Sequence, residues 1–178
     1  MRNLAVLMAL AASPAFAAGL EIDISGQANG TIVIDLFEDV APLHAAQITA
    51  LAASGAYDGV VFHRVLDGFM AQTGDVQFGR TGADLSMAGM GGSDMADIPL
   101  EVSDIPFTRG VIGMARASDP NSANSQFFIM FTEYPSLNGE YTVVGEVTSG
   151  MEVIDAIRRR DPGMGGEADM MTAVRVTP

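Results

Sequence analysis

The chain begins its folded part with two short segments in which apolar and polar residues alternate. Residues 21–25 and residues 31–36 both show this period of two, and residues 26–30 between them have the glycine-rich composition of a turn. The alternation predicts an opening β-hairpin with one buried face. Pro42 then begins a predicted helix, because proline is favoured in the first helical turn and apolar residues follow at helical spacing until about Ser54.

The rest of the chain contains many short apolar runs and one further helical pattern. The second helix is predicted from Met151 to about Arg160. Residues 76–100 are rich in glycine and methionine and are predicted to form a long loop. Its methionines Met87, Met90 and Met95 either form exposed, adaptable contacts or pack onto the surface, and packing is the favoured alternative. Many short strands with few helices are typical of a β-barrel. The predicted strands are residues 60–66, 69–73, 110–115, 126–131, 142–147 and 171–177.

The N-terminus has the pattern of a cleavable signal peptide. Arg2 supplies a positive charge, residues 4–12 form an apolar run, and small residues occupy the two positions that a signal peptidase reads before Ala18. The alternative is a membrane anchor, which the run disfavours because it is shorter than the ~20 residues that span a bilayer. We therefore predict a leader over residues 1–17, a mature domain over residues 18–178, and a periplasmic or secreted protein.

Composition favours one folded domain and restricts its partners. The chain has 178 residues, of which 48% are hydrophobic, and this suits a single core. The absence of cysteine excludes disulfides and thiolate chemistry and is compatible with an oxidising compartment. A net charge of −13 disfavours binding to nucleic acid or to anionic lipid. The one cationic cluster, residues 158–160, is interpreted as complementing the carbonyl groups at the end of the second helix.

The run from residue 61 to residue 75 places a single arginine among apolar residues. If residues 61–66 form a strand, Phe62, Arg64 and Leu66 share one of its faces. Burying an unpaired guanidinium is costly, so two alternatives follow for this side chain. Arg64 either forms a salt bridge or points into a half-wet apolar groove.

Three segments of the sequence resemble the cyclophilins, which are peptidyl-prolyl isomerases. Residues 61–75 match the family pattern F-H-R-V-x-x-G-F-M-x-Q-x-G-D, residues 110–129 contain G-V-I-G-M-A and N-S-Q-F-F-I, and residues 137–147 follow L-N-G with V-V-G-E-V. Order and spacing agree, and the similarity extends over about residues 20–177. The resemblance implies a closed, mostly antiparallel eight-stranded β-barrel with an α-helix over each open end.

The resemblance also implies a peptide-binding site. Arg64, Gln72 and Phe69 are the expected catalytic residues: Arg64 donates hydrogen bonds to the twisting peptide, Gln72 orients the arginine, and Phe69 helps to grip the proline ring. The other expected substrate-binding residues are Met70, Ala115, Arg116, Gln126, Phe128, Leu137 and Tyr141.

Without the resemblance, the apolar candidates would be interpreted as core residues of a barrel. Strand alternation limits how many of them can belong to a site. If Phe128 faces a groove, Phe127 and Ile129 must point to the other side of the strand, into the core.

No metal or cofactor site is expected. The two histidines lie far apart in a chain without cysteine, and the acidic residues 94–97 lack the ligand spacing of a calcium loop. His63 is interpreted as a structural histidine with hydrogen-bond partners, and His44 is interpreted as a surface residue of the first helix.

The resemblance predicts a peptidyl-prolyl cis-trans isomerase that assists the folding of exported proteins. We expect a monomer that acts on proline-containing polypeptides without a cofactor. One alternative is a chaperone-like module that binds proline-containing segments with little turnover, which the presence of Arg64 and Gln72 disfavours. The other is a small-molecule-binding barrel such as a lipocalin, which the dense Val, Ile and Phe of the strands disfavour because they predict a filled interior.

Overall fold

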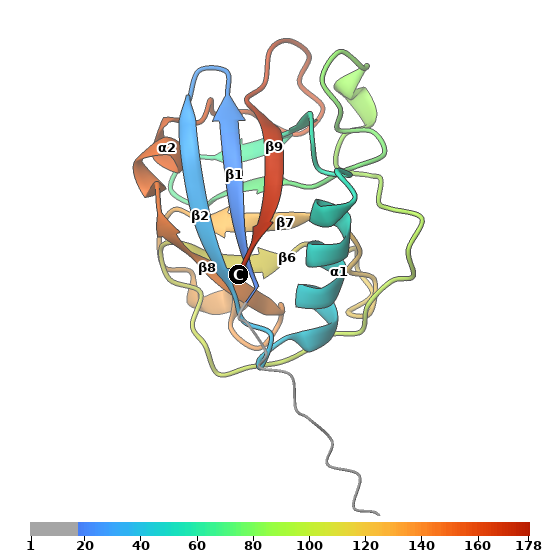
Figure 1. Cartoon of the computed structure of the whole chain (residues 1–178), viewed down its shortest axis with the longest axis vertical. Helices are drawn as coiled ribbons and strands as arrows, with labels where there is room; N and C mark the ends of the chain where they lie inside the picture. The colour runs from blue at the N-terminus through green and yellow to red at the C-terminus, as the bar shows by residue number, and fades with distance from the viewer. Residues whose placement is uncertain (1–17) are drawn as a thin grey trace, which may run out of the picture.

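The strands form one strongly curled antiparallel sheet around an apolar core (Figure 1). The computed structural model describes residues 18–178, so the predicted leader lies outside the described residues. The strands are β1 (Gly19–Ser25), β2 (Gly30–Leu36), β3 (Val60–Val61), β4 (Arg64–Leu66), β5 (Met70–Thr73), β6 (Val111–Met114), β7 (Phe127–Met130), β8 (Val143–Ser149) and β9 (Met170–Thr177). Their order in the sheet is β3-β9-β1-β2-β8-β6-β7-β5-β4. In Figure 1, β9, β1 and β2 pass in front of β6 and β7, which run across them.

Two α-helices lie on opposite sides of this sheet. In Figure 1, α1 runs beside β9 and α2 lies beyond β2. The helices are α1 (Pro42–Ala53) and α2 (Met151–Ala156), together with the short 3₁₀ helices η1 (Leu85–Met87) and η2 (Pro135–Leu137). The predictions of the opening hairpin and of a first helix that begins at Pro42 were confirmed.

The predicted closed eight-stranded barrel was wrong, because the predicted strand over residues 60–66 is broken. Its first part, β3, pairs with β9, whereas its second part, β4, pairs with β5. Between them, Phe62 donates its backbone N–H to the carbonyl of Asp169 at 2.8 Å. The sheet is therefore an open half-barrel of nine strands. The break also separates Phe62, which packs in the main core, from Arg64, which is half-buried outside it.

The core is filled by the apolar faces that the alternation predicts. Leu20, Ile22 and Ile24 of β1 are buried, and Ile22 lies opposite Ile32 of β2. No room for a water molecule remains in the innermost space, which is lined by Leu20, Ile34, Leu36, Ile48, Ile112 and Phe127. A filled interior disfavours the alternative of a small-molecule-binding barrel.

The second helix is shorter than predicted, and its three following arginines differ in role. Because α2 ends at Ala156, all three lie beyond it. Arg159 still reaches the helix end, where it donates to the carbonyl of Asp155 at 3.0 Å. Arg160 is buried and forms an isolated β-bridge with Val65. The interpretation as a helix-end cluster was therefore wrong for Arg160.

His44 is fully buried in α1, so its interpretation as a surface residue was wrong. Its Nδ1 atom lies 2.6 Å from the carboxylate of Glu101, which also accepts the backbone N–H groups of Leu43 and His44 at 3.2 and 3.1 Å. The first N–H groups of a helix have no partner within the helix. Glu101 therefore caps α1 from a distant loop. Burial lowers the pKa of His44 even though the neighbouring carboxylate opposes this shift.

His63 is also buried, but neither of its ring nitrogens has a hydrogen-bond partner within residues 18–178. The expected hydrogen bonds are therefore not formed at good geometry, although the neighbouring Gln126 side chain still interacts with the ring and favours its protonated form. Desolvation lowers the pKa of His63 to about 4, the charge of Asp75 opposes this shift, and the charges of Arg64 and Arg160 add to it.

The stability of the protein should therefore fall in mild acid. The unfolded chain protonates His63 near the ordinary pKa of 6.5, whereas the folded chain keeps it neutral until about pH 4. The unfolded state binds more protons in this window. The contribution of His63 to the free energy of unfolding is therefore fully present above pH 6.5, and it falls toward pH 4 by about 1.4 kcal/mol per pH unit. Urea unfolding at neutral pH and near the lower end of this window measures the loss, which should be smaller for His63→Gln. An equal loss in both proteins would contradict this account.

Candidate active site

Nine of the ten candidate site residues line one small cavity of about 110 Å³. The lining comes from β4, β5 and β7, from the end of β6, and from the loop that contains η2. The nine residues are Arg64, Phe69, Met70, Gln72, Ala115, Arg116, Phe128, Leu137 and Tyr141. The tenth candidate, Gln126, lines an adjoining cavity instead. Candidates that are up to about eighty positions apart in the sequence are thus brought together at one place.

The pairing of four adjacent strands sets the central residues of this cavity in a row. Arg64 lies opposite Gln72, Gln72 lies opposite Phe128, and Phe128 lies opposite Gly113. Residues that are directly paired in a sheet project to the same face. The neighbouring Phe127 packs in the main core, as the alternation along this strand predicts.

Gly113 completes the row and makes room for the ring of Phe128. A Cβ atom at this position would lie 2.4 Å from Cζ of Phe128 and 2.6 Å from Cε1 of Phe107. Glycine allows the Phe128 ring to lie on the sheet and to stack on Phe107, with 5.7 Å between the ring centroids. Gly113 was not among the predicted site residues, although a glycine inside an apolar strand commonly marks such a close approach.

A chain of hydrogen bonds links Arg64 to the long loop. Nη1 of Arg64 donates to Oε1 of Gln72 at 3.2 Å, and Nε2 of Gln72 donates to Oε1 of Gln126 at 2.9 Å. Nε2 of Gln126 then donates to the carbonyls of Gly89 and Gly91 at 3.0 and 2.8 Å. Each amide group is fixed at both ends, so the loop and the two glutamines together restrict the orientation of Arg64.

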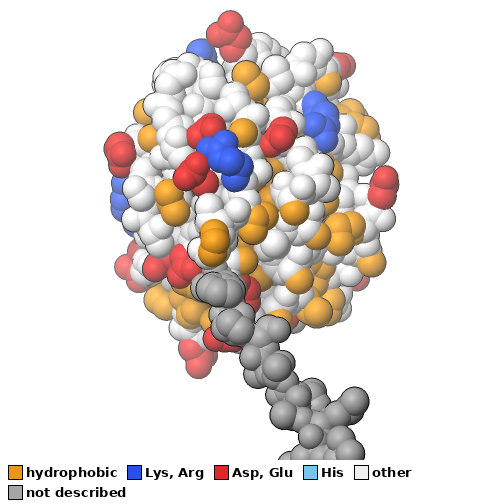
Figure 2. Space-filling model, in the orientation of Figure 1, with side chains coloured by type: hydrophobic (Ala, Val, Ile, Leu, Met, Phe, Trp, Pro, Cys, Tyr) orange, Lys and Arg blue, Asp and Glu red, His pale blue; other side chains and the backbone are white. Residues whose placement is uncertain are grey.

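Arg64 lines a groove and forms no salt bridge within the described residues. It is half-buried and has no carboxylate within salt-bridge distance in the described part of the chain. Its Cζ atom lies 5.7 Å from the centroid of the Phe69 ring. The small cavity contains a second cation, Arg116, and no carboxylate. The face of the molecule shown in Figure 2 carries scattered acidic side chains. Since the whole chain has a net charge of −13, the small cavity is a locally cationic site in an acidic protein.

A larger cavity of about 510 Å³ adjoins the small one. The two cavities share Gln72, Ala115 and Arg116. Residues 89–93 of the long loop form part of the lining, and Met90 among them is 75% exposed. The other two methionines of this loop are also exposed. The expectation that these methionines pack onto the surface was therefore wrong, and Met90 instead offers an adaptable apolar contact beside the cavity.

Asp75 organises the loop that borders the larger cavity. It is fully buried, and its carboxylate accepts four backbone N–H groups. Oδ1 accepts those of Gln77 at 3.1 Å and Phe78 at 2.8 Å, while Oδ2 accepts those of Gly89 at 2.7 Å and Gly91 at 3.0 Å. Asp75 belongs to the first of the matched motifs, but no role was predicted for it. Its position after a glycine at the end of a strand was the available signal.

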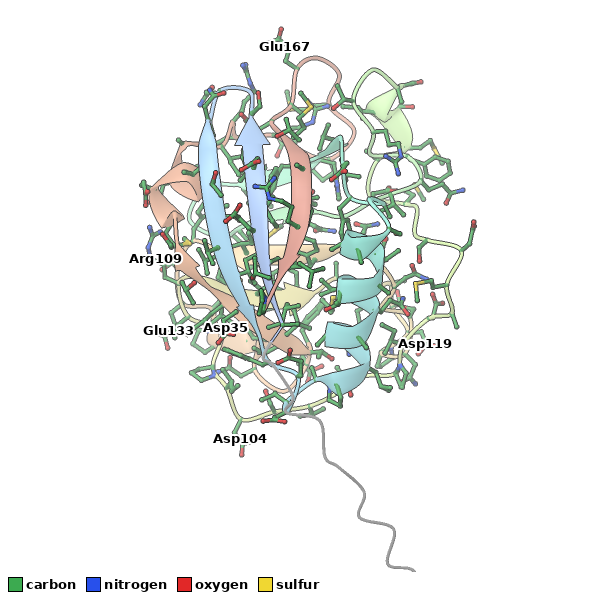
Figure 3. All side chains as sticks on the ribbon, in the orientation of Figure 1. Asp35, Asp104, Arg109, Asp119, Glu133 and Glu167 are labelled. Atoms are coloured by element: carbon green, nitrogen blue, oxygen red, sulfur yellow. The ribbon has the colours of Figure 1, made fainter. Side chains whose placement is uncertain are left out.

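Neither a metal site nor a membrane-spanning helix is found in the described part of the chain. Within residues 18–178, no three His, Asp or Glu side chains gather closely enough to hold a metal ion. No helix in the same part of the chain is long and apolar enough to cross a bilayer. Figure 3 shows the labelled side chains of Asp104, Asp119, Glu133 and Glu167 at the edge of the view, pointing away from the body of the protein.

Sequence comparisons match nearly all of the described chain to one family. The family model described as cyclophilin type peptidyl-prolyl cis-trans isomerase/CLD matches residues 20–177. A protein of Brucella suis, named a probable peptidyl-prolyl cis-trans isomerase, is 54% identical over 143 residues, which cover 79% of this chain and 70% of the relative. A peptidyl-prolyl cis-trans isomerase of Arabidopsis thaliana is 40% identical over 136 residues, with coverage of 76% and 81%.

Solved structures agree with this family. The cyclophilin-type isomerase of Cryptosporidium parvum has a TM-score of 0.76 at 25% identity and covers 92% of this chain and 99% of its own. Its structure in the presence of the dipeptide Ala-Pro has a TM-score of 0.75 at 27% identity, with coverage of 90% and 99%. The fold and the matched motifs define a cyclophilin. The chain belongs to the cyclophilin-type peptidyl-prolyl cis-trans isomerases and is an enzyme of that activity.

Proposed function

We propose that the small cavity holds the proline ring of a Xaa-Pro segment and that Arg64 promotes rotation about the peptide bond before it. The observation that carries the proposal is the gathering of nine candidates around one cavity with a half-buried, unpaired guanidinium. Phe69, Met70, Phe128 and Leu137 supply its apolar walls. A volume of about 110 Å³ suits one small ring rather than a drug-sized ligand, which occupies about 300–1,000 Å³.

Rotation about this bond requires no nucleophile, no metal and no loss of a proton. The barrier of about 18–20 kcal/mol arises because resonance gives the C–N bond partial double-bond character. In the twisted state the proline nitrogen regains a lone pair that accepts a hydrogen bond. The N–H groups of Arg64 form a fixed fork that donates to this nitrogen or to the preceding carbonyl. The contact to the nitrogen forms only in the twisted state, because the planar amide nitrogen accepts no hydrogen bond, so this contact raises the rate rather than the affinity.

Proline-containing polypeptides are the proposed substrates. The Cryptosporidium relative has been solved in the presence of Ala-Pro, which supports the same substrate class for this chain. Residues next to the proline would reach the larger cavity, because the two cavities share three lining residues. We expect a monomer without nucleic-acid or membrane partners, since a net charge of −13 repels both.

Exchange spectroscopy on an Ala-Pro peptide with substoichiometric protein tests this function. Acceleration of cis-trans exchange is the expected result. Binding of the peptide without acceleration would favour the alternative of a module that holds proline-containing segments. Arg64→Ala serves as the matched variant, because it should bind the peptide with nearly unchanged affinity and lose the acceleration.

We also propose that the protein is exported and assists the folding of exported proteins. Removal of residues 1–17 would leave a mature chain of residues 18–178. The backbone nitrogen of Ala18 contacts the carboxylate of Glu38. Cleavage before Ala18 would turn this nitrogen into an ammonium group, which the carboxylate stabilises. Uncatalysed prolyl isomerisation takes tens of seconds or more, so an isomerase in the same compartment would speed a slow folding step.

The mature protein should begin at Ala18 or within a residue or two of it. Mass spectrometry and N-terminal sequencing of the exported protein measure this. Ala17→Tyr should block processing, because the peptidase accepts only small residues there, whereas Phe16→Tyr should not, because that position lies between the two that are recognised. Recovery of membrane-embedded protein that retains Met1 would refute the export proposal.

A further inference from the structure

The side chain of Arg116 joins the two loops that flank the small cavity. Its Nη1 atom donates to the carbonyl of Ala117 at 3.0 Å, and its Nη2 atom donates to the carbonyl of Glu140 at 3.1 Å. Ala117 follows β6, whereas Glu140 precedes β8. One guanidinium therefore fixes two segments that the sequence separates by 24 residues.

The same guanidinium lies over the ring of Tyr141. Cζ of Arg116 is 4.5 Å from the ring centroid, a distance at which a cation is attracted to the face of an aromatic ring. On another side, the ring of Tyr141 meets Phe128 edge to face, with 5.9 Å between centroids and an interplanar angle of 85°. Nε of Arg116 is buried, so this part of the cation is sheltered from water and the attraction is strengthened.

We propose that Arg116 is a positioning residue that holds the ring of Tyr141 as one wall of the proline pocket. The inference rests on the proposed function of the small cavity. Tyr141 stands on a loop, and without the guanidinium its side chain would be free to occupy other rotamers. The wall contacts the proline ring in the ground state and in the twisted state alike. Arg116 therefore acts through the Michaelis constant, in contrast to Arg64, whose donors act on the rotating bond.

Steady-state kinetics distinguish a residue that acts on substrate binding from one that acts on the rotating bond. Arg116→Ala should raise KM for an Ala-Pro peptide by about tenfold, as expected for the loss of one partly sheltered cation–π contact, with kcat unchanged within about twofold. Arg116→Lys should behave like the alanine variant, because an ammonium group cannot bond two carbonyls in one plane while it stacks on a ring. Arg109→Ala is the matched control, since this guanidinium pairs with Asp155 away from the cavity.

A spectroscopic test asks whether Arg116 acts through Tyr141. The chain contains three tyrosines and no tryptophan, so 3-fluorotyrosine labelling gives three fluorine signals, and Tyr141→Phe identifies one of them. Arg116→Ala should move the Tyr141 signal and leave that of Tyr57, which is fully buried and donates to the carbonyl of Ser125 at 2.8 Å. In a Tyr141→Leu background, Arg116→Ala should add little to KM.

Four results would overturn the proposal: an unmoved Tyr141 signal, an equal KM effect in both backgrounds, a fall in kcat at constant KM, or full recovery with lysine. The two proposals fail in different ways. If Tyr141→Leu leaves KM unchanged, the cavity is not the proline pocket. If Tyr141→Leu raises KM but Arg116→Ala does not, the pocket stands and the positioning role is wrong.

Discussion

Replacing Arg64 with alanine should lower kcat/KM for Xaa-Pro peptides by about 10²–10³-fold, the usual cost of removing one donor that acts only in the transition state. The donors of Arg64 stand in a cavity with apolar walls, where each contact exceeds its value in water. Arg64→Lys should recover little, because a point charge cannot reproduce the planar fork. A peptide isomerisation assay on the purified variants gives the comparison.

The fold should tolerate this substitution. Arg64 forms no salt bridge in the described chain, and its side-chain hydrogen bond to Gln72 is worth only about 1 kcal/mol. Urea unfolding of Arg64→Ala should therefore resemble that of Arg109→Ala, which removes a surface guanidinium paired with Asp155. Near-normal turnover in a folded Arg64→Ala protein would refute the proposed mechanism.

The local sequence pattern was enough to predict the opening hairpin and the start of α1, but not the pairing of distant strands in the sheet. The opening hairpin and the start of α1 at Pro42 follow from periodicity and from the fixed geometry of proline. The break in residues 60–66 could not be predicted, because both halves have the composition of a strand and only distant partners distinguish them. The Glu101 cap of α1 is likewise supplied by a loop that is remote in sequence.

The candidate site followed from the family resemblance rather than from the residue pattern. Phe69, Phe128 and Leu137 would be interpreted as core residues from composition alone, since nothing local distinguishes a cavity wall from a core. The structure places all three at one cavity. Gly113 and Asp75 were missed for a different reason. They shape the site from outside the cavity lining, so they are not among the residues expected to contact a substrate. Their positions carried a sequence signal, but the ring that Gly113 makes room for and the N–H groups that Asp75 accepts are brought to them only in the folded chain.

Replacing Asp75 with alanine should destabilise the protein by about 3–5 kcal/mol, because each buried N–H group left without its acceptor costs about 1–3 kcal/mol and water can reach only some of them. Four backbone N–H groups would lose their acceptor, two of them from Gly89 and Gly91. The carbonyls of the same two glycines hold Gln126, which holds Gln72. Isomerase activity should therefore fall by about tenfold as well, since the orientation of Arg64 depends on this chain of hydrogen bonds.

Two further variants show whether the carboxylate itself is responsible. Asp75→Asn preserves the shape of the side chain but presents an NH₂ group to one pair of N–H donors, so it should lose most of the same stability. Asp84→Ala is the matched control, because Asp84 lies in the same loop, is exposed, and has Ser86 as its neighbouring donor, whose backbone N–H it accepts at 2.9 Å. Its unfolding midpoint in urea should remain close to that of the unaltered protein. If Asp75→Asn is as stable and as active as Asp84→Ala, the loop does not depend on the Asp75 carboxylate, and the support of Arg64 must come from the glutamines alone.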